Sequence, residues 1–160
     1  MGKMNVLQDI HYIPLRATTT DVATFSTKCI SMKLAEKVEF IVYFGAINTD
    51  GFTLTVCQSS AATMTGGTAI ACRYRLSAAA QSDTMGATTA LETTGLDVVE
   101  TGTYDLMTLI IDVDSQDMTT ESLPYVGLTF TGSGDESQVS TIGALVWPKY
   151  PKETNAGYLT

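Results

Sequence analysis

The chain has 160 residues, which is enough for one domain with a substantial core and too few for two comfortable ones. It carries 17 acidic and 9 basic residues, a net charge of −8, and this balance argues against nucleic-acid binding, which needs clustered lysine and arginine. Charged residues make up only 16% of the chain, and threonine, which favours half-buried pleated surface, is the most frequent type. These totals favour an all-β protein.

Residues 1–20 are expected to form an irregular N-terminal arm. Tyr12 and Ile13 place an aromatic and an apolar side chain in a segment without a clear period, so the arm must dock on its own domain or on a neighbouring chain. The arm lacks the apolar centre of a secretion signal, and no stretch of the chain is long and apolar enough to cross a bilayer. We therefore expect neither export nor a membrane partner.

One domain is expected over residues 21–147, and its central stretch is 38–59. Period two runs through both halves of this stretch and predicts two strands, while residues 48–51 between them favour a tight turn. The pattern therefore predicts a hairpin. We expect the remaining strands to pack on this hairpin as a two-layer antiparallel sandwich. A first strand is predicted within residues 21–32.

The two faces of the first strand in this hairpin differ in character. One face consists of phenylalanine and valine only, and other strands must cover it. The opposite face is mixed, with Ile41 and Tyr43 beside Glu39. This mixed face has two interpretations: it contacts solvent, or it contacts a partner chain.

The second half of the chain predicts further strands. Residues 69–76 form one, in which Arg73 and Arg75 share a face. Residues 77–92 are mostly small, and we interpret them as a surface excursion with a contact role, because long loops in compact domains are usually functional or mobile. A short edge strand is expected within residues 93–101. A strong strand follows at residues 104–113, and two more strands are predicted at 125–131 and 138–147.

Turn signals at near-regular intervals separate about eight predicted strands, which is typical of a sandwich or a jelly roll. From residue 148 onward, prolines and small polar residues predict an extended tail over 148–160. The expected fold is therefore an all-β, single-domain antiparallel β-sandwich, jelly-roll-like, with extended N- and C-terminal arms.

The sequence contains no recognisable set of catalytic residues. Its single histidine, His11, lies in the irregular arm, and a Ser-His-Asp or Cys-His mechanism would have to run through it. No residue beside it in the sequence is an evident nucleophile. We expect no enzymatic activity and no cofactor.

The three cysteines, Cys29, Cys57 and Cys72, have no C-x-x-C spacing, and no histidine lies near Cys57 or Cys72. The favoured interpretation makes them small buried hydrophobic residues in a protein of a reducing compartment.

Asp112, Asp114 and Asp117 form the densest acidic group, and their spacing resembles the start of a calcium loop. The resemblance fails at the bend, which lacks a glycine, and at Leu123, which stands where a bidentate glutamate is required. A solvated acidic turn is the favoured interpretation. The alternative, a bound divalent cation, predicts a melting temperature that differs between calcium and a chelator.

With catalysis and metal binding disfavoured, binding to a partner chain is the remaining candidate function. Each of Arg73 and Arg75 either pairs with an acidic neighbour or contacts an anionic group across a subunit interface. Aromatic residues near both ends, in segments of poor periodicity, are typical of interfaces, although Trp147 could equally fold back on its own domain. The predicted interface residues are Tyr12, Ile13, Arg73, Arg75, Trp147, Tyr150 and Tyr158.

Several short segments share their order and spacing with a known family. They are residues 12–14, the strand at 38–45 with the glycine-ended turn after it, residues 71–75, Tyr104 with residues 111–114, residues 125–129 and residues 148–150. In this arrangement the chain resembles the small decoration, or cement, proteins of tailed-bacteriophage heads. The segment 77–92 has no counterpart in that likeness.

The resemblance implies a jelly-roll-like sandwich, commonly a homotrimer, on the capsid exterior of the virion. Such a protein is made in the cytoplasm of the bacterial host, binds the major capsid protein and stabilises contacts between capsid subunits. Its partners would be the capsid and other copies of itself, with neither nucleic acid nor membrane involved.

Two other functions compete with this one. A receptor- or glycan-binding module of a phage tail would need exposed aromatic residues at a shallow site, and Tyr43 and Trp147 could serve. A small hydrolase is disfavoured by the lone histidine. A glycan array separates the first alternative from a capsid-binding protein.

Overall fold

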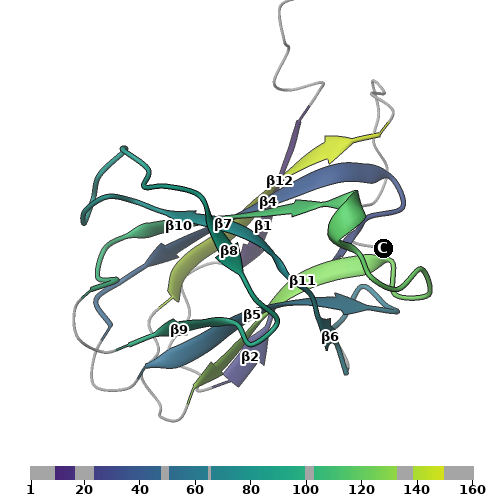
Figure 1. Ribbon diagram of the computed structural model, residues 1–160, viewed down its shortest axis with the longest axis horizontal. Coiled ribbons are helices and arrows are strands. Elements are labelled where there is room, and N and C mark those ends of the chain that lie inside the picture. The colour runs from purple at the N-terminus through teal and green to yellow at the C-terminus, as the bar shows by residue number, and fades with distance from the viewer. Residues whose placement is uncertain are drawn as a thin grey trace, which may run out of the picture.

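A computed structural model describes residues 10–16, 24–47, 51–64, 66–99, 103–132 and 139–149. Two six-stranded sheets pack face to face, with every described strand pair antiparallel (Figure 1). The predicted all-β sandwich is thereby confirmed. Tyr150 and Tyr158, two of the predicted interface residues, lie outside the described residues.

The strands divide between a sheet that we call A and a sheet that we call B. Sheet A runs, in spatial order, β1 (His11–Arg16), β12 (Val139–Pro148), β4 (Ala35–Phe44), β10 (Thr108–Asp114), β7 (Cys72–Leu76) and β8 (Thr89–Leu91). Sheet B runs β2 (Thr24–Ser26), β11 (Tyr125–Gly132), β5 (Phe52–Ser59) and β6 (Thr68–Ala69), with β3 (Ile30–Ser31) paired to β11 and β9 (Leu96–Val98) paired to β5. A single 3₁₀ turn, η1 (Ser115–Asp117), follows β10.

The core lies between the inner faces of the two sheets. The apolar face predicted for the strand at 38–44 is fully buried, and so is the matching face of β5. The rings of Phe44 and Phe52 meet across the interior with their centroids 6.0 Å apart. Because these side chains leave water entirely, they supply much of the hydrophobic free energy that holds the sheets together.

The predicted hairpin over residues 38–59 is wrong. β4 belongs to sheet A and β5 to sheet B, so the chain crosses from one sheet to the other between them. Alternation shows which face of each strand is buried, but it is the same whether two consecutive strands pair side by side or face each other across a core. The rings of Phe44 and Phe52 face each other because β4 and β5 lie on opposite sides of the core.

The single strand predicted over residues 69–76 is also two strands. β6 pairs with β5 in sheet B, and β7 pairs with β10 in sheet A. The crossing point is Ile70, which is buried in the core and lies between the two short strands. An unbroken alternating pattern concealed this change of sheet.

Three further boundaries differ from the predictions. β1 lies within the segment that was expected to be an irregular arm, and it forms an edge of sheet A by pairing with β12. β8 lies within the predicted excursion at 77–92 and buries Leu91. The first predicted strand, within 21–32, is two short strands, β2 and β3. The edge strand β9 and the central position of β10 agree with the predictions.

Candidate functional site: the outer face of sheet A

The outer face of sheet A gathers most of the predicted interface residues that the structure describes. The registers place Tyr12, Leu145, Glu39, Asp112 and Arg73 in one row across the sheet. Directly paired residues of neighbouring strands point to the same side, and the residues that alternate with these on β4, β10 and β12 are buried in the core. This row therefore faces away from the core.

Aliphatic side chains occupy the middle of this outer face. Ile41 pairs with Ile110, and Gly143 and Arg75 continue the row on either side. Tyr43 lies two residues beyond Ile41 on the same side of β4. Ile41 and Ile110 are only partly buried, so apolar surface is exposed at the centre of a six-stranded sheet.

Tyr12 is the most exposed large hydrophobic side chain among the described residues, with 57% of its surface accessible. Its ring lies against the backbone of Gly143, where an added Cβ atom would stand 2.5 Å from the ring. The absence of a side chain at Gly143 therefore lets the aromatic ring lie on the sheet surface. The next residue, Ile13, pairs with Ala144 and packs against the core, so it does not belong to this face.

Lys37 connects the charged and aromatic parts of the face. Its Nζ lies 2.8 Å from Glu39 and 2.7 Å from Asp112, and 5.3 Å from the ring centroid of Trp147. Burial lowers the pKa of Lys37, but its hydrogen bonds to Asp112 and Glu39 outweigh burial, so the pKa lies above its ordinary 10.5. Lys37 is therefore charged at neutral pH, and its ammonium group lies at a distance from the Trp147 ring that suits a cation–π contact.

The two arginines on this face differ. Arg73 forms an ion pair with Asp114. Arg75 lies beside Ile110, and no described acidic residue forms an ion pair with it. A guanidinium next to apolar surface with no carboxylate is suited to contact an acidic group on a partner. Pairing with an acidic neighbour, one of the two interpretations, therefore holds for Arg73, whereas contact across a subunit interface stays a prediction for Arg75.

The acidic group at residues 112–117 is held by other contacts. Asp112 pairs with Lys37, and Asp114 pairs with Arg73. Asp117 Oδ2 accepts a hydrogen bond from the backbone N–H of Asp114, 2.8 Å away, at the start of η1. Within the described residues, no three His, Cys, Asp or Glu side chains are grouped to hold a metal ion. The geometry is that of a turn with paired acids.

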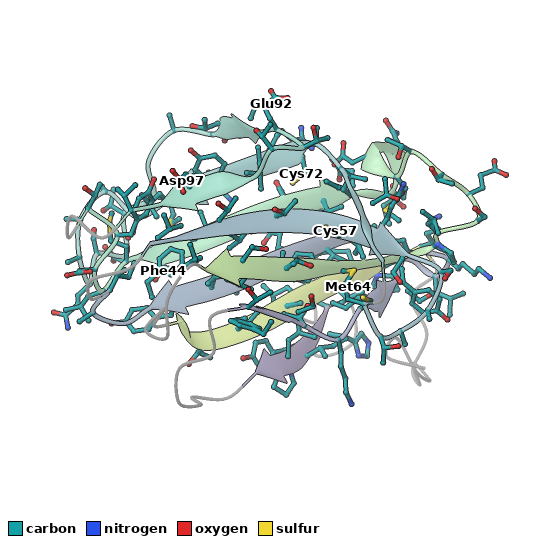
Figure 2. All side chains as sticks on the ribbon, turned by 90° about the horizontal axis from the view of Figure 1, so that it is seen from below. Phe44, Cys57, Met64, Cys72, Glu92 and Asp97 are labelled. Carbon is teal, nitrogen blue, oxygen red and sulfur yellow. The ribbon has the colours of Figure 1, made fainter. Side chains whose placement is uncertain are left out.

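The cysteines are buried free thiols. Burial raises the pKa of Cys29 to about 11 and that of Cys72 to about 12, and it also raises the pKa of Cys57. Cys57 lies near Met64 (Figure 2) and belongs to β5 of sheet B, whereas Cys72 belongs to β7 of sheet A. His11 on β1 is separated from Cys72 by three strands of sheet A, so these two residues cannot form a catalytic pair.

Sequence reasoning missed Ile110 and Leu145 as parts of this face. The run around Ile110 was apolar on both sides, and this pattern correctly indicated a central strand. The same pattern suggests two covered faces, whereas one face of β10 has no described layer over it. The sequence signal that could have found this face is an aliphatic residue on the outward side of a strand predicted to be central.

Comparisons of the chain with protein-family models, with curated proteins and with solved structures gave no match. Among the described residues, no helix has the length and apolar character required to span a membrane.

Proposed function

We propose that this chain is a structural protein of a phage virion that binds the outside of the head and stabilises contacts between major capsid subunits. It acts as a homotrimer and carries out no reaction. Its partners are the capsid and other copies of itself, without nucleic acid or membrane.

The observation that carries this proposal is the outer face of sheet A. Exposed apolar surface that is rimmed by polar groups is typical of protein interaction sites. Here Ile41, Ile110 and Leu145 form the apolar part, and Tyr12 adds an exposed aromatic ring. Arg75 offers a charge that no described acidic residue pairs. Aromatic residues and arginine are also the types that most often dominate binding energy at interfaces.

The mechanism requires only binding. A protein that binds the assembled shell and not its separated subunits stabilises the shell by mass action, in proportion to the logarithm of its free concentration over the dissociation constant. A broad, rigid sheet face suits this task, because β4, β10 and β12 hold its side chains in fixed positions and little order is lost on binding.

The test uses purified protein and expanded, empty phage shells. We expect saturable binding in a pelleting assay and a higher disruption temperature of the shells when the protein is bound. Absence of binding, or binding with no change in disruption temperature, would contradict the proposal.

A second candidate is a receptor- or glycan-binding module. It is favoured by the exposed Tyr12 and by Tyr43, which lie on the same outer face, since sugars stack on exposed aromatic rings. Trp147 is less suited, because Lys37 already occupies one side of its ring. Binding to a glycan array, lost on Tyr12→Ala, would support this candidate.

A further inference from the structure

Two of the three thiols lie together on the outer face of sheet B. Val56 and Leu128 are paired residues of β5 and β11 that are buried in the core. The next pair along these strands, Cys57 and Gly127, therefore points outward. A Cβ atom added at Gly127 would stand 3.0 Å from the sulfur of Cys29. Cys29, in the segment just before β3, and Cys57, on β5, thus approach the same glycine from its two sides.

The side chain of Met64 covers these two thiols. A Cβ atom added at Gly127 would stand 3.1 Å from Cε of Met64. A Cβ atom added at Gly67 would overlap Sδ of Met64 and stand 2.9 Å from Cβ of Cys57. Met64 therefore lies over Gly127, where Cys29 also lies, and against Cys57 (Figure 2). Three sulfur-bearing side chains from separate segments of the chain meet above one glycine.

Backbone contacts hold the loop that carries Met64 over the thiols. The N–H of Cys29 donates to the carbonyl oxygen of Ala62, 2.8 Å away, and Lys28 and Thr63 form an isolated antiparallel bridge. The two thiols are buried, whereas Met64 is partly exposed. The three sulfurs are therefore held in place by the fold, and Met64 is the member of the group that reaches solvent.

The two thiols are close to each other but too far apart for a disulfide. Burial and, secondly, the proximity of Cys57 raise the pKa of the Cys29 thiol to about 11. The strand β11 lies between the backbones that carry the two thiols, and two strand spacings amount to roughly 10 Å. The Cα atoms of a disulfide are rarely more than about 7 Å apart. A metal ion held roughly 2.3 Å from each sulfur spans over twice the length of an S–S bond, so it can join thiols at the greater separation.

The donor atoms of this group decide which metal fits. Thiolate and thioether are soft ligands that favour Cu(I), whereas structural Zn²⁺ takes four ligands from Cys, His, Asp and Glu. Among the described residues, no third Cys and no His, Asp or Glu is grouped with these two thiols to hold a metal. A soft monovalent ion that accepts two or three sulfur ligands therefore suits the group, and Zn²⁺ does not.

We propose that Cys29, Cys57 and Met64 form a Cu(I) site on the outer face of sheet B. On binding, each thiol forms one S–Cu bond and releases its proton to solvent, and Sδ of Met64 donates a lone pair. The copper stays Cu(I), so no oxidant or reductant takes part. The bound ion ties β5 to the segment before β3 and to the loop after β5. The inference does not depend on the proposed function, because the site lies on sheet B and the proposed capsid contact on sheet A.

The first test is an anaerobic titration of the purified protein with Cu(I), in competition with the coloured chelator bicinchoninate. We expect an equimolar complex for the wild type and none for Cys57→Ala. Met64→Leu keeps the side-chain volume but removes the thioether, and should bind at least about tenfold more weakly. Cys72→Ala is the matched control, because Cys72 is also a buried free thiol but lies in sheet A. It should bind Cu(I) like the wild type.

The second test measures the melting temperature with and without equimolar Cu(I). A ligand that binds the folded state stabilises it, so the melting temperature should rise for the wild type and for Cys72→Ala and stay constant for Cys57→Ala. Zn²⁺ should have no comparable effect. Circular dichroism checks that each variant is folded, and Met64→Leu, at a partly exposed position, replaces Cys57→Ala if the latter does not fold.

Four results would overturn the inference. A wild-type protein that withdraws no Cu(I) from the chelator has no such site. Equal weakening by Cys57→Ala and Cys72→Ala would show that any buried thiol serves. Unchanged binding by Met64→Leu would remove the thioether from the site. A rise in melting temperature with Zn²⁺ equal to that with Cu(I) would contradict selection of a soft monovalent ion.

Discussion

The two outer faces of the sandwich occupy equivalent positions and differ in composition. On sheet B, the registers align Thr24, Thr131, Thr53 and Asp97 in one row and Ser26, Thr129 and Thr55 in the next. Hydroxyl groups there bond one another, as Ser26 and Thr129 do at 3.0 Å. On sheet A, isoleucine, leucine and tyrosine share the corresponding rows with charged residues.

This difference in composition favours a different role for each face. A threonine-rich outer face satisfies both β-propensity and hydration, so it needs no partner. Ile41 and Ile110 satisfy β-propensity equally well but leave apolar surface in water, which favours association. The same fold therefore carries one face suited to solvent and one suited to binding.

The largest expected effect concerns the inner face of sheet A. Phe40→Ala should lower the free energy of unfolding by about 3–5 kcal/mol, because Phe40 is fully buried and the change leaves a cavity. Chemical denaturation monitored by circular dichroism measures it. A loss below about 1 kcal/mol would mean that Phe40 does not lie in a packed interior.

A smaller effect follows from alkaline pH. The folded Cys72 thiol keeps its proton up to a pKa of about 12, whereas the unfolded thiol loses its proton near 9.0. The stabilising contribution of this thiol is therefore complete below pH 9 and is lost as the pH rises toward 12. Denaturation at pH 8 and pH 10.5 should show a shallower decline for Cys72→Ala than for the wild type. Equal slopes would contradict the burial of this thiol.

The smallest expected effect distinguishes the two arginines. Arg73→Ala removes an exposed ion pair and should cost up to about 1 kcal/mol, whereas Arg75→Ala should change stability by less than about 0.5 kcal/mol, since Arg75 has no described acidic partner. Shell binding should reverse this order, with Arg75→Ala the weaker binder. The same ranking in both assays would remove Arg75 from the contact surface.

The sequence was informative about faces and uninformative about pairing. Period two identified the buried side of the strands at 38–44 and 52–56, because each strand must bury one side. It could not distinguish the hairpin from a crossing between sheets, nor show that the chain changes sheet at Ile70, since these depend on contacts distant in the sequence.

The candidate site was predictable only in part. Tyr12, Trp147, Arg73 and Arg75 were selected by residue type, and the registers bring them to one face. That Arg73 pairs with Asp114 while Arg75 does not depends on the geometry of β7 against β10 and η1, which no sequence pattern records.

Shell binding by a variant that gives sheet A the surface of sheet B is the most direct test of the contact face. The double variant Ile41→Thr/Ile110→Thr keeps β-branched residues and should change stability by less than about 1 kcal/mol. We predict that it binds expanded shells at least about tenfold more weakly than the wild type, while Thr55→Ser/Thr129→Ser on sheet B binds normally. Undiminished shell binding by the sheet A variant would contradict the central claim.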